Sequence, residues 1–241
     1  MPRPVARPRP RSSRSHDPRS RHHSPATARN REPILAVLQA ELPPHGTLLE
    51  IASGTGEHGV FMAPQLHPRH WLPSDIDPEA LASIAAWQQV TPSPTLHPPL
   101  NLDMGDPSWP DQVTNWLQTQ SDRLPPLSAV MAMNMIHISP WAACEGLMAG
   151  AGALLPAGGV LYLYGPFRQA GQSFAPSNQA FDQSLRARHP QWGIRDLEAV
   201  VDCAAHHGLA LKTVISMPAN NLSVVLQRVP GDPQIKHTPG T

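Results

Sequence analysis

The chain has 241 residues, enough for one sizeable α/β domain with a full core, and the length does not require a second domain. Its net charge of zero hides an asymmetry, because residues 1–31 carry a charge of +8 and the remainder carries −8. An acidic folded part disfavours a nucleic-acid-binding face. Two distant cysteines, Cys144 and Cys203, exclude a disulfide framework or a zinc knot and indicate a reducing compartment such as the cytoplasm.

Residues 1–24 are rich in Arg, Pro and Ser and almost without apolar side chains, so we expect a disordered basic tail. Such a segment can also be a mitochondrial transit peptide, but its prolines argue against the amphipathic helix that this signal needs. Order is expected from residue 25, where apolar residues at helical spacing lead to a helix that ends at residues 43–46. The predicted domain spans residues 25–229, and a flexible tail follows at 230–241. No run of 18 apolar residues exists, so we expect no membrane span.

Residues 47–59 predict a buried strand, a turn of small residues and the start of a helix. Gly54, Gly56 and Gly59 match the G-x-G-x-x-G pattern of dinucleotide sites. Glu50, four residues before Gly54, also matches the acidic-x-x-x-G-x-G pattern of S-adenosylmethionine sites. A carboxylate can pair with the ammonium of a methionine moiety and would repel a pyrophosphate, so we favour S-adenosylmethionine as the cofactor.

Acidic residues follow the next two predicted strands. Asp75 comes after a short strand around residues 71–72, at the spacing from the glycines where an acid accepts hydrogen bonds from ribose hydroxyls. The alternative is a helix cap beside Asp77. Asp103 lies in a third strand predicted at residues 100–104, where it is well placed to meet the exocyclic amine of an adenine.

A fourth, fully apolar strand from residue 127 leads into Asn134 and His137, and Ser139 is expected to cap the following helix. Ligands of open α/β sheets bind beyond the carboxyl ends of the strands. His137 is therefore the candidate catalytic base, and the alternative is a structural histidine whose ring bonds a neighbouring backbone group. Asn134 could hold the cofactor or an acceptor amine.

The fifth strand covers residues 160–164, and a polar segment at 168–177 is expected to form a flap. The last two strands, at 209–215 and 222–226, are joined by so short a link that they must be antiparallel. A mostly parallel sheet with a terminal antiparallel hairpin is typical of methyltransferases, whereas the dinucleotide fold normally closes with a parallel strand. Candidates for the acceptor pocket, each with a turn or cap role as the alternative, are Tyr164, Ser177, Asn178, Arg195, Asn220 and Asn221.

Several long strings resemble the uncharacterised methyltransferase-like family called domain of unknown function 938, related to the animal methyltransferase-like protein 26. They are RNREPIL (29–35), LEIASGTGEH (49–58), PSDID (73–77), NMIHISPW (134–141), LYGPF (163–167), APSN (175–178), WGIRDLE (192–198) and MPANNL (217–222). The resemblance implies a Rossmann-like class I methyltransferase fold, with a mostly parallel seven-stranded sheet and a C-terminal antiparallel hairpin. It implies no particular acceptor. Ala52 replaces the first loop glycine of the general pattern, and its small size preserves a close backbone approach to the cofactor.

These patterns together predict an S-adenosylmethionine-dependent methyltransferase that acts on a small-molecule acceptor. A non-catalytic cofactor-binding or scaffold protein is one alternative. An NAD(P)-dependent oxidoreductase is the other, and Glu50 and the terminal hairpin argue against it. No metal site is predicted, because the two adjacent histidine pairs have no partner ligands at metal spacing. The sequence indicates no oligomeric state.

Overall fold

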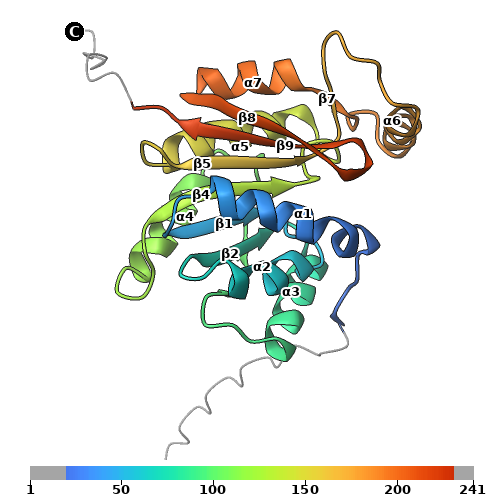
Figure 1. The fold of residues 1–241 in the computed structure, drawn as a ribbon. Helices are drawn as coiled ribbons and strands as arrows, with labels where there is room; N and C mark the ends of the chain where they lie inside the picture. The colour runs from blue at the N-terminus through green and yellow to red at the C-terminus, as the bar shows by residue number, and fades with distance from the viewer. Residues whose placement is uncertain (1–19, 231–241) are drawn as a thin grey trace, which may run out of the picture.

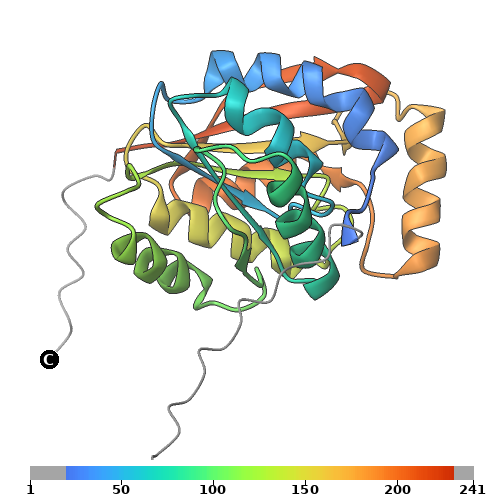
Figure 2. The same cartoon turned by 90° about the horizontal axis from the view of Figure 1, so that it is seen from below.

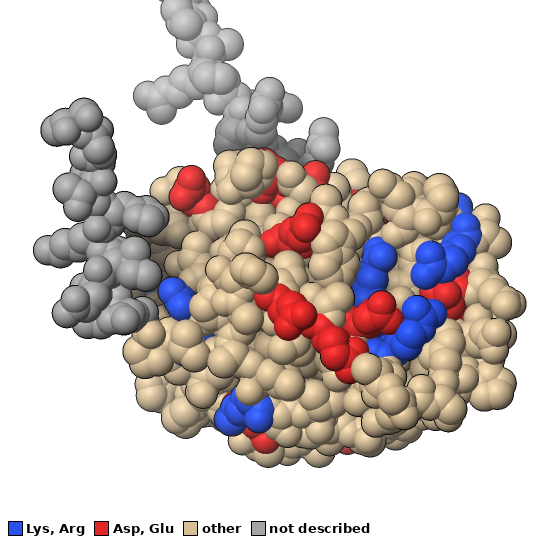
Figure 3. Space-filling model, turned by 90° about the horizontal axis from the view of Figure 1, so that it is seen from above, with Lys and Arg blue, Asp and Glu red and all other residues tan. Residues whose placement is uncertain are grey.

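The computed structural model describes residues 20–230. The predicted tails, apart from residues 20–24 and 230, therefore lie outside the described residues. Within the described part of the chain, no helix is long and apolar enough to cross a membrane. Charged side chains of both signs are interspersed among uncharged ones on the face seen in Figure 3, and neither sign forms a continuous surface there.

One seven-stranded sheet runs through the domain in the order β3-β2-β1-β4-β5-β9-β8 (Figure 1). The strands are β1 (Thr47–Ile51), β2 (His70–Asp75), β3 (Leu100–Asn101), β4 (Leu127–Met133), β5 (Val160–Gly165), β8 (Leu209–Met217) and β9 (Asn221–Arg228). The pairs from β3 to β5 are parallel, and β9 is antiparallel to both β5 and β8. This order confirms the predicted fold class, including the terminal hairpin.

Helices cover both faces of the sheet (Figure 2). They are α1 (Pro25–Glu41), α2 (Glu57–Gln65), α3 (Pro78–Val90), α4 (Trp109–Thr119), α5 (Trp141–Leu154), α6 (Pro176–Arg188) and α7 (Leu197–His206). The apolar residues of α1 and α2 pack on one face, and those of α4, α5 and α7 pack on the other.

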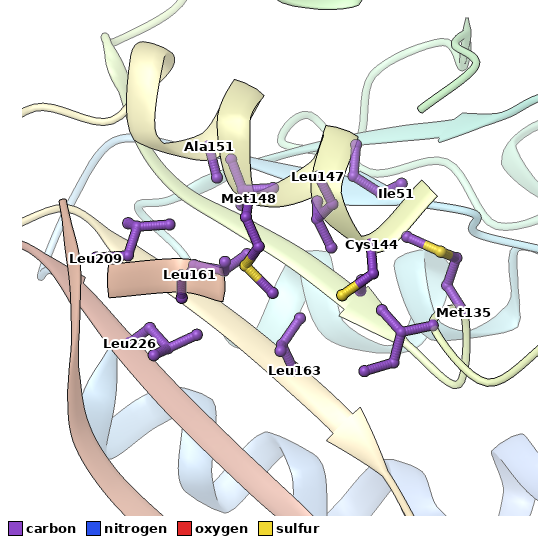
Figure 4. Packing of buried hydrophobic residues seen from close by; sticks show 14 of the residues in the cluster. Ile51, Met135, Cys144, Leu147, Met148, Ala151, Leu161, Leu163, Leu209 and Leu226 are labelled. Atoms are coloured by element: carbon purple, nitrogen blue, oxygen red, sulfur yellow. The ribbon is translucent and has the colours of Figure 1, made fainter. Parts of the chain in front are cut away.

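The buried strands alternate between the two cores. Leu48 packs with α1 and α2, whereas its neighbour Leu49 packs with α4 and α5. Figure 4 shows Met148 of α5 beside Leu161 of β5, and Leu147 nearer to Ile51. Because both faces are covered, the parallel strands consist of nearly continuous apolar residues.

Two local predictions were wrong, and one element was not predicted. The third strand is only two residues long, because the chain turns at Asp103, whose Oδ1 accepts from the Gly105 N–H at 2.7 Å. Ser139 does not cap α5, because its hydroxyl donates to the Met135 carbonyl at 3.0 Å. The unpredicted element is a small parallel sheet formed by β6 (Phe167–Arg168) and β7 (Arg195–Asp196).

Residues 20–24, which the sequence analysis placed in the tail, contact α2 and α3. The Ser24 N–H donates to Glu57 Oε2, and Ser24 Oγ in turn caps α1. The His22 N–H donates to Ser83 Oγ at 2.8 Å, and the His22 carbonyl accepts from Trp87 Nε1 at 3.0 Å. This short segment therefore lies beside the turn that follows β1.

Candidate functional site

The turn after β1 approaches α3 closely on one side and is open on the other. Ala52, Gly54 and Gly56 all have positive φ, at 54°, 57° and 85°. A Cβ on Gly56 would lie 2.8 Å from Ile84 Cα, so this position needs glycine. A Cβ on Gly54 would meet nothing within 4 Å, so the turn faces open space there. Ala52 adopts the conformation expected of the glycine that it replaces.

Asp75 ties this turn to the end of β2. Its Oδ2 accepts from the Gly54 N–H at 2.8 Å, and its Oδ1 accepts from the Asp77 N–H at 3.0 Å. Asp77, not Asp75, caps α3, because Asp77 Oδ1 accepts from the Glu79 N–H at 2.9 Å. Each Asp75 oxygen keeps a further lone pair, so the buried carboxylate can accept from a ligand hydroxyl.

Glu50 is enclosed next to the turn. Its side chain is 1% exposed, and its Oε2 accepts from Trp71 Nε1 at 2.9 Å. Burial raises the pKa of Glu50 to about 7, and the negative charge of Asp75 adds to this effect. Hydrogen bonds from Ser53 and Trp71 oppose the shift. A cation brought to this carboxyl would lower its pKa and favour the charged form.

Asp103 and Asn134 extend the same edge of the sheet to either side of the turn. Asp103 follows β3 and is exposed. Asn134 follows β4 with a φ of 60°, and its N–H donates to the Tyr164 carbonyl at 2.8 Å. The carboxyl ends of β3, β2, β1 and β4 therefore carry, in this spatial order, Asp103, Asp75, the glycine turn and Asn134.

A buried polar network joins four distant segments on the α1 side of this edge. His58 Nε2 hydrogen-bonds to Asn30 Oδ1 at 3.0 Å. Burial raises the pKa of Tyr164, and the nearby side-chain amides of Asn30 and Asn221 oppose this shift. Burial also lowers the pKa of His58 to about 4, so the ring is neutral and donates its Nε2 proton to the amide oxygen. Sequence reasoning missed Asn30 and His58, whose only signal was their place in the RNREPIL and LEIASGTGEH strings.

Two cavities of about 200 Å³ each flank the turn at residues 218–221. One lies against α1 and is lined by Arg29, Asn134, Tyr164 and Asn221, among others. The other lies against residues 167–175 and is lined by Asn178, Asn220 and Asn221 among others. Asn178 Nδ2 donates to the Asn220 carbonyl, and Asn220 Nδ2 donates to Ser177 Oγ, both at 3.0 Å. These two bonds attach α6 to the turn that separates the cavities.

His137 lies at the predicted edge but is covered. It is 1% exposed, its Nδ1 has no hydrogen-bond partner in the described part of the chain, and the Phe181 ring of α6 lies 5.9 Å away, centroid to centroid. Burial, together with a smaller effect of the Arg195 charge, lowers its pKa to about 4. A Cβ added to Gly165 would lie 3.1 Å from His137 Nδ1 and 3.4 Å from Asn134 Oδ1. Because glycine has no Cβ, these two polar atoms border the same small gap beside Gly165.

Arg195 holds the segment that follows β4. Its Nε donates to the Ile136 carbonyl at 3.0 Å, and one terminal nitrogen donates to the Ser139 carbonyl at 2.6 Å. It lines neither of the two cavities. The structure therefore shows Arg195 as a support for the segment that carries His137, outside both cavities.

Residues 21–228 match the family model described as "Protein of unknown function (DUF938)". The fold is also similar to solved methyltransferases. An O-methyltransferase family protein from Burkholderia thailandensis matches with a TM-score of 0.65 and 14% identity, over 86% of this chain and 58% of its own. Human N-acetylserotonin methyltransferase, in complex with SAM, matches with a TM-score of 0.65 and 12% identity, over 85% of this chain and 53% of its own.

A third solved structure, an O-methyltransferase family 2 protein from Planctomyces limnophilus DSM 3776 in complex with apigenin, has a TM-score of 0.64 and 19% identity. It matches over 85% of this chain and 60% of its own. This chain thus spans less than two thirds of the length of each of the three structures. At these identities the similarity establishes a methyltransferase fold and no more.

Proposed function

The chain belongs to this family of unknown function, and we propose that it is an S-adenosylmethionine-dependent methyltransferase acting on a small-molecule acceptor. The observation that carries the proposal is the turn after β1, which is open above Gly54 and fixed through the Gly54 N–H to the carboxylate of Asp75. The SAM complex of a structural neighbour with the same fold supports the same ligand.

The residues along this edge suit the groups of that ligand. Glu50 would repel a pyrophosphate and attract a cation. In our proposal, Asp75 accepts from the ribose hydroxyls, Asp103 from the adenine amine, and Glu50 pairs with the ammonium of the methionine moiety. The bound cofactor would supply an electrophilic methyl group on a sulfonium.

The part of the protein in catalysis is then chiefly to hold the acceptor in line with that methyl group. We place the acceptor beyond Asn134, because the adenosine and methionine sites proposed above occupy the ends of β3 to β1. An acceptor that must lose a proton needs a base, and His137 is our candidate. Its ring is covered by Phe181, so this role requires the Phe181 side chain to move.

A non-catalytic S-adenosylmethionine-binding protein is the second candidate, and the burial of His137 favours it. An oxidoreductase using NAD(P) fits less well, because of Glu50 and the antiparallel β9.

Calorimetry and thermal shift with S-adenosylmethionine, its demethylated product S-adenosylhomocysteine, NAD⁺ and NADP⁺ test the proposal. We expect only the first two to bind, with a stabilisation of about 2.7 kcal/mol at roughly 100 times the dissociation constant. Asp75→Asn should weaken binding at least about 10-fold, whereas Asp77→Asn, which retains the α3 cap, should not. A methyl-transfer screen of metabolite extracts then separates enzyme from binding protein. Stabilisation by a nicotinamide cofactor alone would overturn the cofactor assignment.

A further inference from the structure

The cavity on the α1 side of residues 218–221 has features that point to the chemistry of its occupant. Its polar lining is provided by Arg29, Asn30, Asn134, Tyr164 and Asn221. We infer that this cavity holds the methyl acceptor and that the acceptor carries a carboxylate, which binds the guanidinium of Arg29. The inference rests on the proposed function and adds to it a class of substrate.

Charge is the first reason. Among the described residues that line the cavity, Arg29 is the only charged one, so none of them is acidic. Within residues 20–230, Arg29 forms no ion pair, hydrogen bond or ring contact. Arg31, two residues along the same helix, instead lies over the Phe61 ring at 4.5 Å from its centroid. An arginine that lines the cavity and has no partner among residues 20–230 is matched by a carboxylate, which its guanidinium can bind through two parallel hydrogen bonds.

The rigidity of the opposite walls is the second reason. The side chains of Asn30 and Asn221 lie close to the Tyr164 hydroxyl, and Asn221 Nδ2 donates to the Pro218 carbonyl at 3.0 Å. His58 fixes Asn30 from behind. Such a network sets the direction of each polar group before a ligand arrives, which lowers the entropic cost of binding.

Backbone strain is the third reason. Asn134, Ala219 and Asn220 have φ values of 60°, 59° and 57°; asparagine adopts this left-handed conformation readily, so the strain lies at Ala219. Asn134 and Ala219 line the cavity and Asn220 adjoins it. Strain of this kind concentrates at ligand sites, where it aims side chains and backbone groups.

Size and position limit the occupant further. About 200 Å³ is below the range of roughly 300–1,000 Å³ typical of sites for drug-sized ligands, so the acceptor is small. The cavity begins at Asn134, next to the position proposed for the methionine end of the cofactor, and extends toward β9.

The test measures binding of small carboxylic acids and their primary amides, with benzoate and benzamide as the first pair, under saturating S-adenosylhomocysteine. Short aliphatic acids and hydroxybenzoates, each with its amide, complete the set. We expect at least one acid to bind about 10-fold or more tightly than its amide. Arg29→Gln should reduce this preference to within about 2-fold, and the control Arg31→Gln should retain it. Both side chains are on α1, so the comparison isolates the position of the charge.

Several results would overturn the inference. One is that no acid in the set binds. A second is that the preference for acids over amides persists in Arg29→Gln. A third is an equal loss of affinity for S-adenosylhomocysteine in Arg29→Gln, because the guanidinium would then bind the carboxylate of the cofactor. Failure of the proposed function gives a different result, which is no binding of S-adenosylhomocysteine by the unmodified protein. Arg29 is exposed, so the variant should fold, and its melting temperature verifies this.

Discussion

Replacement of Glu50 by Gln tests whether the buried acid serves the fold or the cofactor. Glu50 is 1% exposed, and burial raises its pKa from 4.5 to about 7. Gln has the same shape and keeps an oxygen that can accept from Trp71 Nε1, but it carries no charge. The substitution therefore removes the titration and leaves the packing nearly unchanged.

The sign of the effect follows from linkage. The folded state holds the Glu50 proton more tightly than the unfolded chain does. The favourable contribution of Glu50 protonation to the free energy of unfolding is complete below about pH 4.5 and is lost as the pH rises through about 7. The two pKa values correspond to a penalty of about 3 kcal/mol at pH 8. We expect Glu50→Gln to be more stable than the unmodified protein by up to this amount at pH 8, and by little at pH 4.5.

Urea unfolding between pH 4.5 and 8.5 measures this difference, with Glu79→Gln, an exposed acid in the first turn of α3, as the control. Calorimetry at pH 8 should show at least about a 10-fold loss of affinity for S-adenosylhomocysteine, because an amide cannot pair with an ammonium. A variant with the same pH profile as the unmodified protein, or one less stable at pH 8, would refute the burial argument. Unchanged affinity would refute the pairing with the ammonium.

Three other changes have expected outcomes. Gly56→Ala should lower stability by well over 1 kcal/mol, because its Cβ would lie 2.8 Å from Ile84 Cα. Gly54→Ala should cost only about 1 kcal/mol and should chiefly weaken S-adenosylhomocysteine binding. Thermal melting measures the first effect and calorimetry the second. The pKa of His137 is about 4 in the folded protein and 6.5 in the unfolded chain, so the unfolding free energy should fall as the pH drops from 6.5 to 4. In urea titrations, His137→Gln should reduce that fall. Deletion of residues 1–19 should leave the melting temperature unchanged, whereas a deletion that extends to residue 24 should lower it, because Ser24 and its neighbours hydrogen-bond to α2 and α3.

The sheet was predictable because each of its longer parallel strands is a short, nearly continuous apolar run, and because the link between β8 and β9 is only three residues. The small sheet formed by β6 and β7 was not predictable from the sequence. Each strand has two residues, one of the four is apolar, and the partners Arg168 and Asp196 are 28 positions apart. No periodic pattern can indicate so short a pairing.

The two parts of the candidate site, the turn after β1 and the α1-side cavity, also differ in how far the sequence could predict them. The glycine turn and Asp75 follow consecutive strands, so spacing alone brought them together in the sequence analysis. The α1-side cavity combines α1, the ends of β4 and β5, and the turn before β9. Tyr164 and Asn221 could be named individually as polar residues at the ends of strands. Nothing in the sequence indicated that Asn30 and His58 would join them, because that contact depends on how α1 packs across the sheet.

Ala52 offers a last test of how the turn after β1 is used. Its φ of 54° costs an alanine about 1–2 kcal/mol, and glycine avoids that cost at the expense of about 0.5–1 kcal/mol in backbone entropy. Ala52→Gly should therefore raise the unfolding free energy by roughly 0.5–1 kcal/mol. The more flexible turn must then be ordered when the cofactor binds, so affinity for S-adenosylhomocysteine should fall a few fold. Ala210→Gly, in the exposed part of β8, is the control and should only lose stability. A gain in both stability and affinity would show that the strain at Ala52 has no part in holding the ligand.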